Sequence, residues 1–193
     1  MDKYKLIISS FGKDRFKFNE EIKNHTALNI GGPAEVFFIA FTTSELIKII
    51  NMCRELELPF FLLGTGSKVM LSDYGFPGLI IKNRTKNIQT ISVKGKVTKF
   101  GIGVEEALVE IDSGVSINKF SEYLDSQNLS SDGLKELPGS IGGNLFMSAF
   151  LQSKAESIKV LTQGGDIEKV LPYNLALKKH IILSAVFKMK AKK

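Results

Sequence analysis

The sequence has a single cysteine, Cys53, only two histidines and no tryptophan. One cysteine cannot form a disulfide within the chain, which is typical of proteins in a reducing compartment, so a cytoplasmic location is expected. The two histidines, His25 and His180, belong to no cluster with metal-ligand spacing, and no metal site is predicted. Cys53 lies among apolar residues at helical spacing and is predicted to be a buried structural thiol.

Long apolar runs and dense charge are also scarce. No stretch approaches the length of a bilayer span, and residues 1–10 lack the apolar segment of a secretory signal, so neither a membrane partner nor a leader is expected. The net charge is +6, but the lysines are scattered and no basic helix carries interleaved aromatic residues. Nucleic acid is therefore not expected as a partner. A moderate positive field would suit a phosphorylated metabolite.

What the chain does have is a large apolar content, 44% of residues, with patterns of both strands and helices. Thr42 and Glu45 have the spacing of a capping box that begins a helix, which Pro59 should end, and Ser116 should cap a second helix. Glycines predict hairpin turns at Gly95 and at 164–165. Strands are expected at 36–40, 60–64, 78–82, 107–114 and 181–190.

This mixture, with the hairpins confined to the second half, favours an α+β fold over a doubly wound parallel sheet. The polar stretch "KNRTKN", residues 82–87, separates a first part without expected hairpins from a second part that contains them. Two domains are therefore predicted, residues 1–85 and residues 86–193.

Glycine-rich segments are the strongest functional signal. The stretch "LLGTGSKVML", residues 62–71, follows an expected strand. Its spacing excludes a Walker A loop, and Val69 stands where a dinucleotide fingerprint needs a third glycine. Two interpretations remain, a tight structural turn or a nest of exposed amides that binds a phosphate oxygen. Two further clusters, "NIGGPAE" and "LPGSIGGNLFMSA", favour a ligand, because three such clusters are hard to explain as turns alone.

In this order and spacing, "TALNIGGPAEVF", "LPFFLLGTGSKVMLSDYGFPGLII" and "LPGSIGGNLFMSA" resemble the bacterial UDP-N-acetylenolpyruvoylglucosamine reductases, the MurB family of flavoenzymes. The resemblance runs from about residue 24 to about residue 188. It implies an FAD-binding fold of the vanillyl-alcohol-oxidase type, in which two α+β subdomains hold FAD between them. Residues 1–85 would form the first FAD-binding subdomain and residues 86–193 the second.

The resemblance also implies which residues bind FAD. The loop that cradles the pyrophosphate would be Gly64, Thr65, Gly66, Ser67, Lys68 and Val69. The segment against the flavin would be Pro138, Gly139, Ser140, Gly142 and Gly143. Thr26, Gly31 and Gly32 would approach FAD from the first subdomain.

The activity that the resemblance implies is an FAD-dependent oxidoreductase of peptidoglycan synthesis, and so of cell wall biogenesis, cell shape and cell division. NADPH would reduce UDP-N-acetylglucosamine enolpyruvate, a UDP-sugar, to UDP-N-acetylmuramate. The chain departs from the family at Lys68, which replaces an asparagine, and at "MSAFLQS", residues 147–153. No Tyr-Arg-x-Ser motif precedes the last strand, and the family's third domain, which binds the sugar, has no counterpart.

Because of these departures, no catalytic residue is assigned. The main alternative is a truncated FAD-binding module without reductase activity, for which a partner chain would supply the substrate domain. A structural interaction protein with vestigial glycine loops is a third interpretation.

Overall fold

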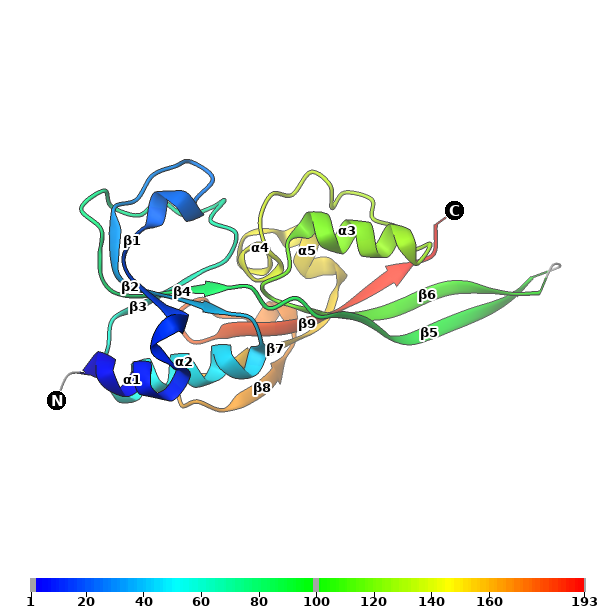
Figure 1. Cartoon of the computed structure of the whole chain (residues 1–193). Helices are drawn as coiled ribbons and strands as arrows, with labels where there is room; N and C mark the ends of the chain where they lie inside the picture. Colours follow the sequence, from blue (N-terminus) through cyan, green and yellow to red (C-terminus); the bar gives the residue numbers. More distant parts are fainter. Residues whose placement is uncertain (1–2, 99–100, 193) are drawn as a thin grey trace. The chain divides into compact units, whose positions relative to one another are not determined.

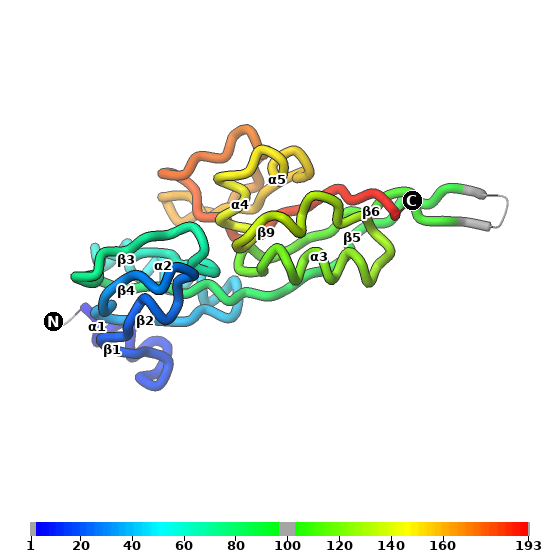
Figure 2. The backbone as a smooth tube through the Cα atoms, turned by 90° about the horizontal axis from the view of Figure 1, so that it is seen from above, coloured from blue at the N-terminus to red at the C-terminus, as the bar shows by residue number. Residues whose placement is uncertain are grey.

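The computed structural model describes residues 3–98 and 101–192. The chain divides into two compact units between Thr85 and Lys86, called unit 1 and unit 2 below (Figures 1 and 2). No helix within the described ranges is long and apolar enough to cross a membrane.

Unit 1 is a four-stranded sheet with two helices and two short 3-10 helices. The elements are α1 (Lys3–Phe11), η1 (Lys13–Arg15), β1 (Phe16–Glu21), η2 (Ile22–His25), β2 (Pro33–Ala40), α2 (Thr43–Glu55), β3 (Phe60–Leu63) and β4 (Phe76–Asn83). The strand order is β1-β2-β4-β3; β1 pairs antiparallel with β2, while β4 pairs parallel with both β2 and β3. The segments α1 and β1 were not predicted from the sequence.

The sheet of unit 1 has two differently covered faces. On one face, the ring of Phe38 packs against the ring of Phe11 from α1, with 4.9 Å between their centroids. On the opposite face, the imidazole of His25 stacks on Phe37 at 4.3 Å. In Figure 1, α1 and α2 accordingly lie on one side of the strands, and the loops that carry the glycines lie on the other. The glycine segments therefore share the Phe37 face.

Helix α2 begins where the sequence predicts and ends earlier. Thr42 accepts a hydrogen bond from the Glu45 amide, as an N-cap should. The predicted stop at Pro59 is wrong, because the helix ends at Glu55 and is closed by a Schellman motif. The amide of Leu58 donates to the Cys53 carbonyl at 2.8 Å, and Glu57 takes a positive φ of 51°. The thiol of Cys53 is fully buried, and burial raises its pKa to about 12, as expected for a structural cysteine.

Replacing the left-handed residue of this motif should stabilise unit 1. Glu57→Gly removes the steric cost of a left-handed residue with a side chain, partly offset by glycine's chain entropy, for a net gain of up to about 1 kcal/mol. Helix α3 of unit 2 supplies the matched control, because Asn128 occupies the same position with φ 55°. Asparagine tolerates this conformation better, so Asn128→Gly should gain less. Thermal unfolding of both variants measures the difference, and an equal gain at the two sites would contradict this account.

Unit 2 is an antiparallel five-stranded sheet that packs against three helices. Its elements are β5 (Ile88–Thr98), β6 (Gly101–Asp112), α3 (Ile117–Ser126), α4 (Ile141–Met147), α5 (Ala149–Lys154), β7 (Ala155–Leu161), β8 (Ile167–Val170), η3 (Pro172–Asn174) and β9 (Ile181–Lys190). The strand order is β5-β6-β9-β7-β8. In both Figures 1 and 2 the β5–β6 hairpin extends away from the rest of the unit. The buried side chains of α3, α4 and α5 form one core with those of β6, β7 and β9.

Most of unit 2 matches the sequence prediction. Ser116 caps α3, β7 and β8 form the hairpin expected around residues 164–165, and β9 has the predicted bounds. The predicted turn at Gly95 is wrong. Gly95 lies inside β5 opposite Val104, beside a shift in register, and the two strands stay paired as far as Thr98 and Gly101. A glycine inside a strand here marks a bulge instead of the end of the hairpin.

Candidate functional site

In unit 1 the structure brings together the two predicted glycine segments. The amide of Ala27 donates to the Gly66 carbonyl at 3.1 Å. A third segment, residues 71–75, joins them, because the Gly31 amide donates to Asp73 Oδ1 at 3.1 Å and the Gly32 amide donates to the Ser72 carbonyl at 2.9 Å. These three segments cover the Phe37 face of the sheet, immediately beyond the end of β3.

Two glycines in these segments are required by the chain's own packing. Gly66 has φ +79°, and a Cβ at this residue would lie 2.1 Å from the His25 carbonyl oxygen. A Cβ at Gly32 would lie 2.1 Å from the Asp73 carbonyl oxygen. Both distances are far below van der Waals contact, so only glycine fits. The sequence predicted that these glycines approach a ligand, whereas the group that lies against each of them in the structure is the protein's own backbone.

The loop after β3 nevertheless leaves polar groups without partners. Within the described ranges, the amides of Thr65, Gly66 and Ser67 have no hydrogen-bond acceptor. Gly66 is buried and has a left-handed φ of +79°. A buried N–H without an acceptor costs about 1–3 kcal/mol. Thr65 is exposed and Ser67 is half-buried, so this cost falls mainly on the Gly66 amide. The three consecutive amides without acceptors are the candidate site for an anionic oxygen.

Side chains of the same loop are mostly engaged with the protein or with solvent. The Thr65 and Ser67 hydroxyls bond to each other at 3.1 Å, and Lys68 is exposed. Val69 packs against the apolar cluster on the Phe37 face, so only its backbone can meet a ligand. The Thr26 hydroxyl donates to the Ile30 carbonyl at 2.9 Å and thereby closes its own turn. The loop therefore presents mainly backbone to a ligand.

A buried lysine that sequence reasoning missed lies beside this loop. Lys82, on β4, is 5% exposed, and its Nζ donates to the His25 carbonyl at 3.1 Å. Burial, and secondarily the charge of Arg84, lowers the pKa of Lys82 to about 8. The sequence signal for this buried charge was the lysine that ends "GLIIK", residues 78–82, because it is the one charged residue of an otherwise apolar segment.

In unit 2 the predicted segment 138–143 begins helix α4. Ser140 is the N-cap, and Gly142 and Gly143 lie in the first turn of the helix rather than in a loop. The Ile141 and Gly142 amides donate to the Val115 and Ser113 carbonyls at 2.8 and 2.9 Å, so neither is left for an anion. Pro138 and Gly143 are exposed, and Gly139 is half-buried with φ +116°. The exposed residues of this segment, Pro138 and Gly143, thus present little side chain to solvent.

A second residue that sequence reasoning missed holds this segment in shape. Asn144 is fully buried in α4, and its Nδ2 donates to the carbonyls of Pro138 and Ser140, both at 3.0 Å. One amide group thereby ties the turn before the helix to the first helical turn. The sequence signal was an asparagine directly after the paired glycines, within an otherwise apolar run.

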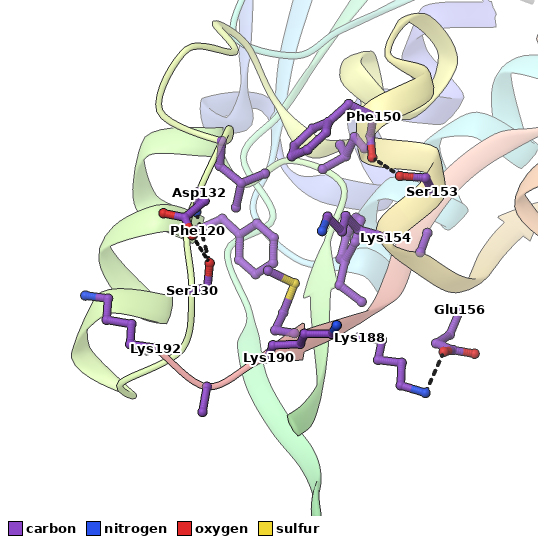
Figure 3. Close-up of a pocket in the computed structure, with 16 residues that line it drawn as sticks. Phe120, Ser130, Asp132, Phe150, Ser153, Lys154, Glu156, Lys188, Lys190 and Lys192 are labelled. Atoms are coloured by element: carbon purple, nitrogen blue, oxygen red, sulfur yellow. Dashed lines mark hydrogen bonds and ion pairs between the residues drawn. The ribbon is translucent and has the colours of Figure 1, made fainter. Parts of the chain in front are cut away.

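Unit 2 also contains a cavity of about 720 Å³ between α3, α5 and the end of β9 (Figure 3). Phe120 and Phe187 line it, with Lys154 and Lys190 among its charged groups. None of the site residues predicted from the sequence lines this cavity. Across the described residues, no three histidine, cysteine, aspartate or glutamate side chains gather as a metal site would require.

Comparison with known proteins agrees with these features. Residues 34–170 match the family model described as "FAD binding domain", a range that includes 64–69 and 138–143 but excludes Thr26, Gly31 and Gly32. A UDP-N-acetylenolpyruvoylglucosamine reductase of Clostridium tetani is 29% identical over 95% of this chain and 60% of its own. One from Syntrophomonas wolfei is 26% identical over 91% of this chain and 56% of its own. The chain thus spans a little over half the length of these relatives.

Solved structures show the fold. The chain is similar to UDP-N-acetylenolpyruvylglucosamine reductase (MurB) from Thermus caldophilus, with a TM-score of 0.65, 20% identity, and coverage of 92% of this chain and 62% of that one. It is also similar to p-cresol methylhydroxylase, with a TM-score of 0.63, 12% identity, and coverage of 98% and 43%. The predicted α+β fold of the vanillyl-alcohol-oxidase and MurB type is confirmed.

Proposed function

This chain belongs to the FAD-binding domain family, and we propose that it binds FAD, with the diphosphate at the loop after β3. The observation that carries the proposal is the set of three amides, on Thr65, Gly66 and Ser67, that have no acceptor within the described residues. A diphosphate oxygen satisfies such amides without any side-chain charge. The buried charge of Lys82 beside them has the sign that a diphosphate needs.

We further propose that the segment 138–143 of unit 2 receives the flavin. Its support is the surface that Pro138, Gly139 and Gly143 leave open, because a flat ring system needs close approach to backbone. Gly143 fits the role of a flavin contact best, because the chain's own packing does not require a glycine there. A Cβ at this residue would meet only the Ser140 hydroxyl, at 3.6 Å. In unit 1, we propose that Thr26, Gly31 and Gly32 support the loop through their bonds within the protein and do not bind the ligand directly.

The finer proposal is reductase activity. Bound FAD would supply hydride chemistry, with NADPH as the electron donor and the enolpyruvyl group of a UDP-sugar as the acceptor. The support is the name of the relatives, UDP-N-acetylenolpyruvoylglucosamine reductase, and the match to them over most of this chain. Peptidoglycan synthesis in the cytoplasm is the role that this activity would serve.

Two measurements on the purified chain test these proposals in turn. The first is FAD titration, followed by flavin fluorescence and absorbance, and we expect saturable binding to a folded protein. A folded chain that leaves the flavin spectrum unchanged at high FAD concentration would overturn the first proposal. The second is NADPH oxidation under nitrogen, with and without the enolpyruvyl UDP-sugar. Stimulation by the sugar is expected of a reductase, whereas FAD binding without stimulation would favour a binding module that requires a partner chain.

A further inference from the structure

The charge on Lys82 stands in an apolar environment. In the register of the sheet it lies beside Ile39 of β2 and Leu63 of β3. It shares its face of β4 with Ile80, which belongs to the apolar cluster of that face. The loop segments at 22–32 and 64–75 cover the same face. A side chain at this position would ordinarily be aliphatic.

Among the described residues, the ammonium of Lys82 has no counter-ion. Its Nζ donates to one backbone carbonyl, that of His25, and in the described part of the chain no carboxylate forms an ion pair with it. The nearby charge that affects it is Arg84, which is of the same sign. A buried charge without a partner is strongly unfavourable unless a ligand supplies the opposite charge.

The position of this ammonium relative to the amide nest follows from one shared atom. The His25 carbonyl oxygen that accepts from Lys82 is the same atom that a Cβ on Gly66 would meet. The ammonium and the backbone of Gly66 are therefore both neighbours of the His25 carbonyl oxygen, and Gly66 carries the middle one of the three amides without acceptors. The charge of Lys82 and the three amides thus lie on segments joined through one carbonyl group.

We propose that Lys82 supplies the counter-charge for a diphosphate bound at the loop after β3, acting through its field across a region of low dielectric. This inference rests on the proposed function, because the diphosphate is that of FAD. Charges separated by one layer of backbone still interact strongly when neither is in water. Lys82 is therefore a positioning residue of the loop, and its own proton should respond to the ligand.

The direction of that response follows from the sign of the ligand. Without ligand, burial disfavours the charged form, so a large fraction of Lys82 is neutral above pH 8. A bound diphosphate favours the charged form and raises the pKa, so binding at pH 8.5 should take up a proton. The titratable groups on the two covering segments are Lys23, His25, Lys68, Asp73 and Tyr74, while Glu20 lies on β1 and Arg84 directly after β4. Lys68 is exposed, and it serves as the control cation of the same loop.

The experiment is calorimetric titration of the full chain with FAD, ADP and riboflavin at pH 8.5, in two buffers of different ionisation enthalpy. FAD and ADP should each bind with uptake of roughly half a proton, and riboflavin with none. The uptake should vanish in Lys82→Met and persist in Lys68→Asn. At pH 7, Lys82→Met should weaken FAD binding about tenfold, the effect of a one-unit rise in pKa on binding. It should leave riboflavin binding unchanged.

A second variant guards against misfolding. Lys82→Gln keeps a donor for the His25 carbonyl and removes only the charge, so it should fold and still lose the proton uptake. Equal proton uptake in wild type and in Lys82→Gln would overturn the inference. Equal weakening of FAD and riboflavin binding in Lys82→Met would also overturn it. Either result is expected of a lysine that only supports the backbone. If wild-type protein binds FAD without proton uptake, the inference fails while the proposed function stands. If wild type binds no FAD, both fail.

Discussion

Gly66→Val should lower the stability of unit 1 by about 2–4 kcal/mol, because valine adds the cost of a left-handed conformation to that of an overpacked contact. The Cβ would have to occupy space 2.1 Å from the His25 carbonyl oxygen, which is backbone and cannot rotate away. The turn at 25–27 and the loop at 64–68 must therefore separate. Since this separation disperses the three amides, FAD retention should be lost together with stability.

The measurement is thermal or urea unfolding together with flavin content after purification. Gly143→Ala is the matched control, because its new Cβ would meet only the Ser140 hydroxyl at 3.6 Å, within the first turn of α4. Alanine favours a helix by up to about 1 kcal/mol over glycine, so this variant should be at least as stable as wild type. Any loss of FAD affinity in it would come from the exposed surface alone. Wild-type stability in Gly66→Val would show that the two segments are not packed against each other.

Gly66 also shows what the sequence could and could not predict. A glycine pair after a strand predicts a loop with unusual backbone, and that loop is present. Whether the space beside Gly66 belongs to a ligand or to the chain depends on residues 25–27, about forty positions earlier, and no local pattern reports that contact. The sequence predicted the position of the loop, and only the folded chain distinguishes the packing role of Gly66 from the open amides on the same turn.

The same difference between local and long-range contacts explains which helices could be predicted from the sequence. Helices α2 and α3 were predicted, because side-chain caps and apolar periodicity are local properties. Helix α4 was missed, because Gly142 and Gly143 are poor helix formers. The amides at its start are held by the carbonyls of Ser113 and Val115, which are distant in sequence. Tertiary contacts thus override weak propensity at the second glycine segment, as they do for the charge of Lys82 inside β4.

Asn144→Leu should cost unit 2 about 1–3 kcal/mol, because it removes hydrogen bonds that a fully buried side chain makes to the backbone. Leucine has a similar volume, so the change removes the hydrogen bonds to Pro138 and Ser140 without opening a large cavity. The Ser140 carbonyl keeps its helical bond from the backbone amide of residue 144, so most of the loss falls on the turn at 138–139. Amide hydrogen exchange in 138–143 should accelerate, and the affinity for FAD should fall.

The same substitution at Asn51 provides the control. Both asparagines lie in helices, but only Asn144 ties a neighbouring turn to its helix through hydrogen bonds. The Asn51 Oδ1 is buried in α2 and has no hydrogen-bond partner among the described residues, so Asn51→Leu removes an unsatisfied group and should be neutral or stabilising. The difference in unfolding free energy between the two variants therefore isolates the hydrogen bonds of Asn144 from the effect of a larger apolar side chain. Equal effects at both positions, or unchanged exchange at 138–143 in Asn144→Leu, would show that the turn keeps its shape without this amide. The flavin surface proposed for unit 2 would then need another support.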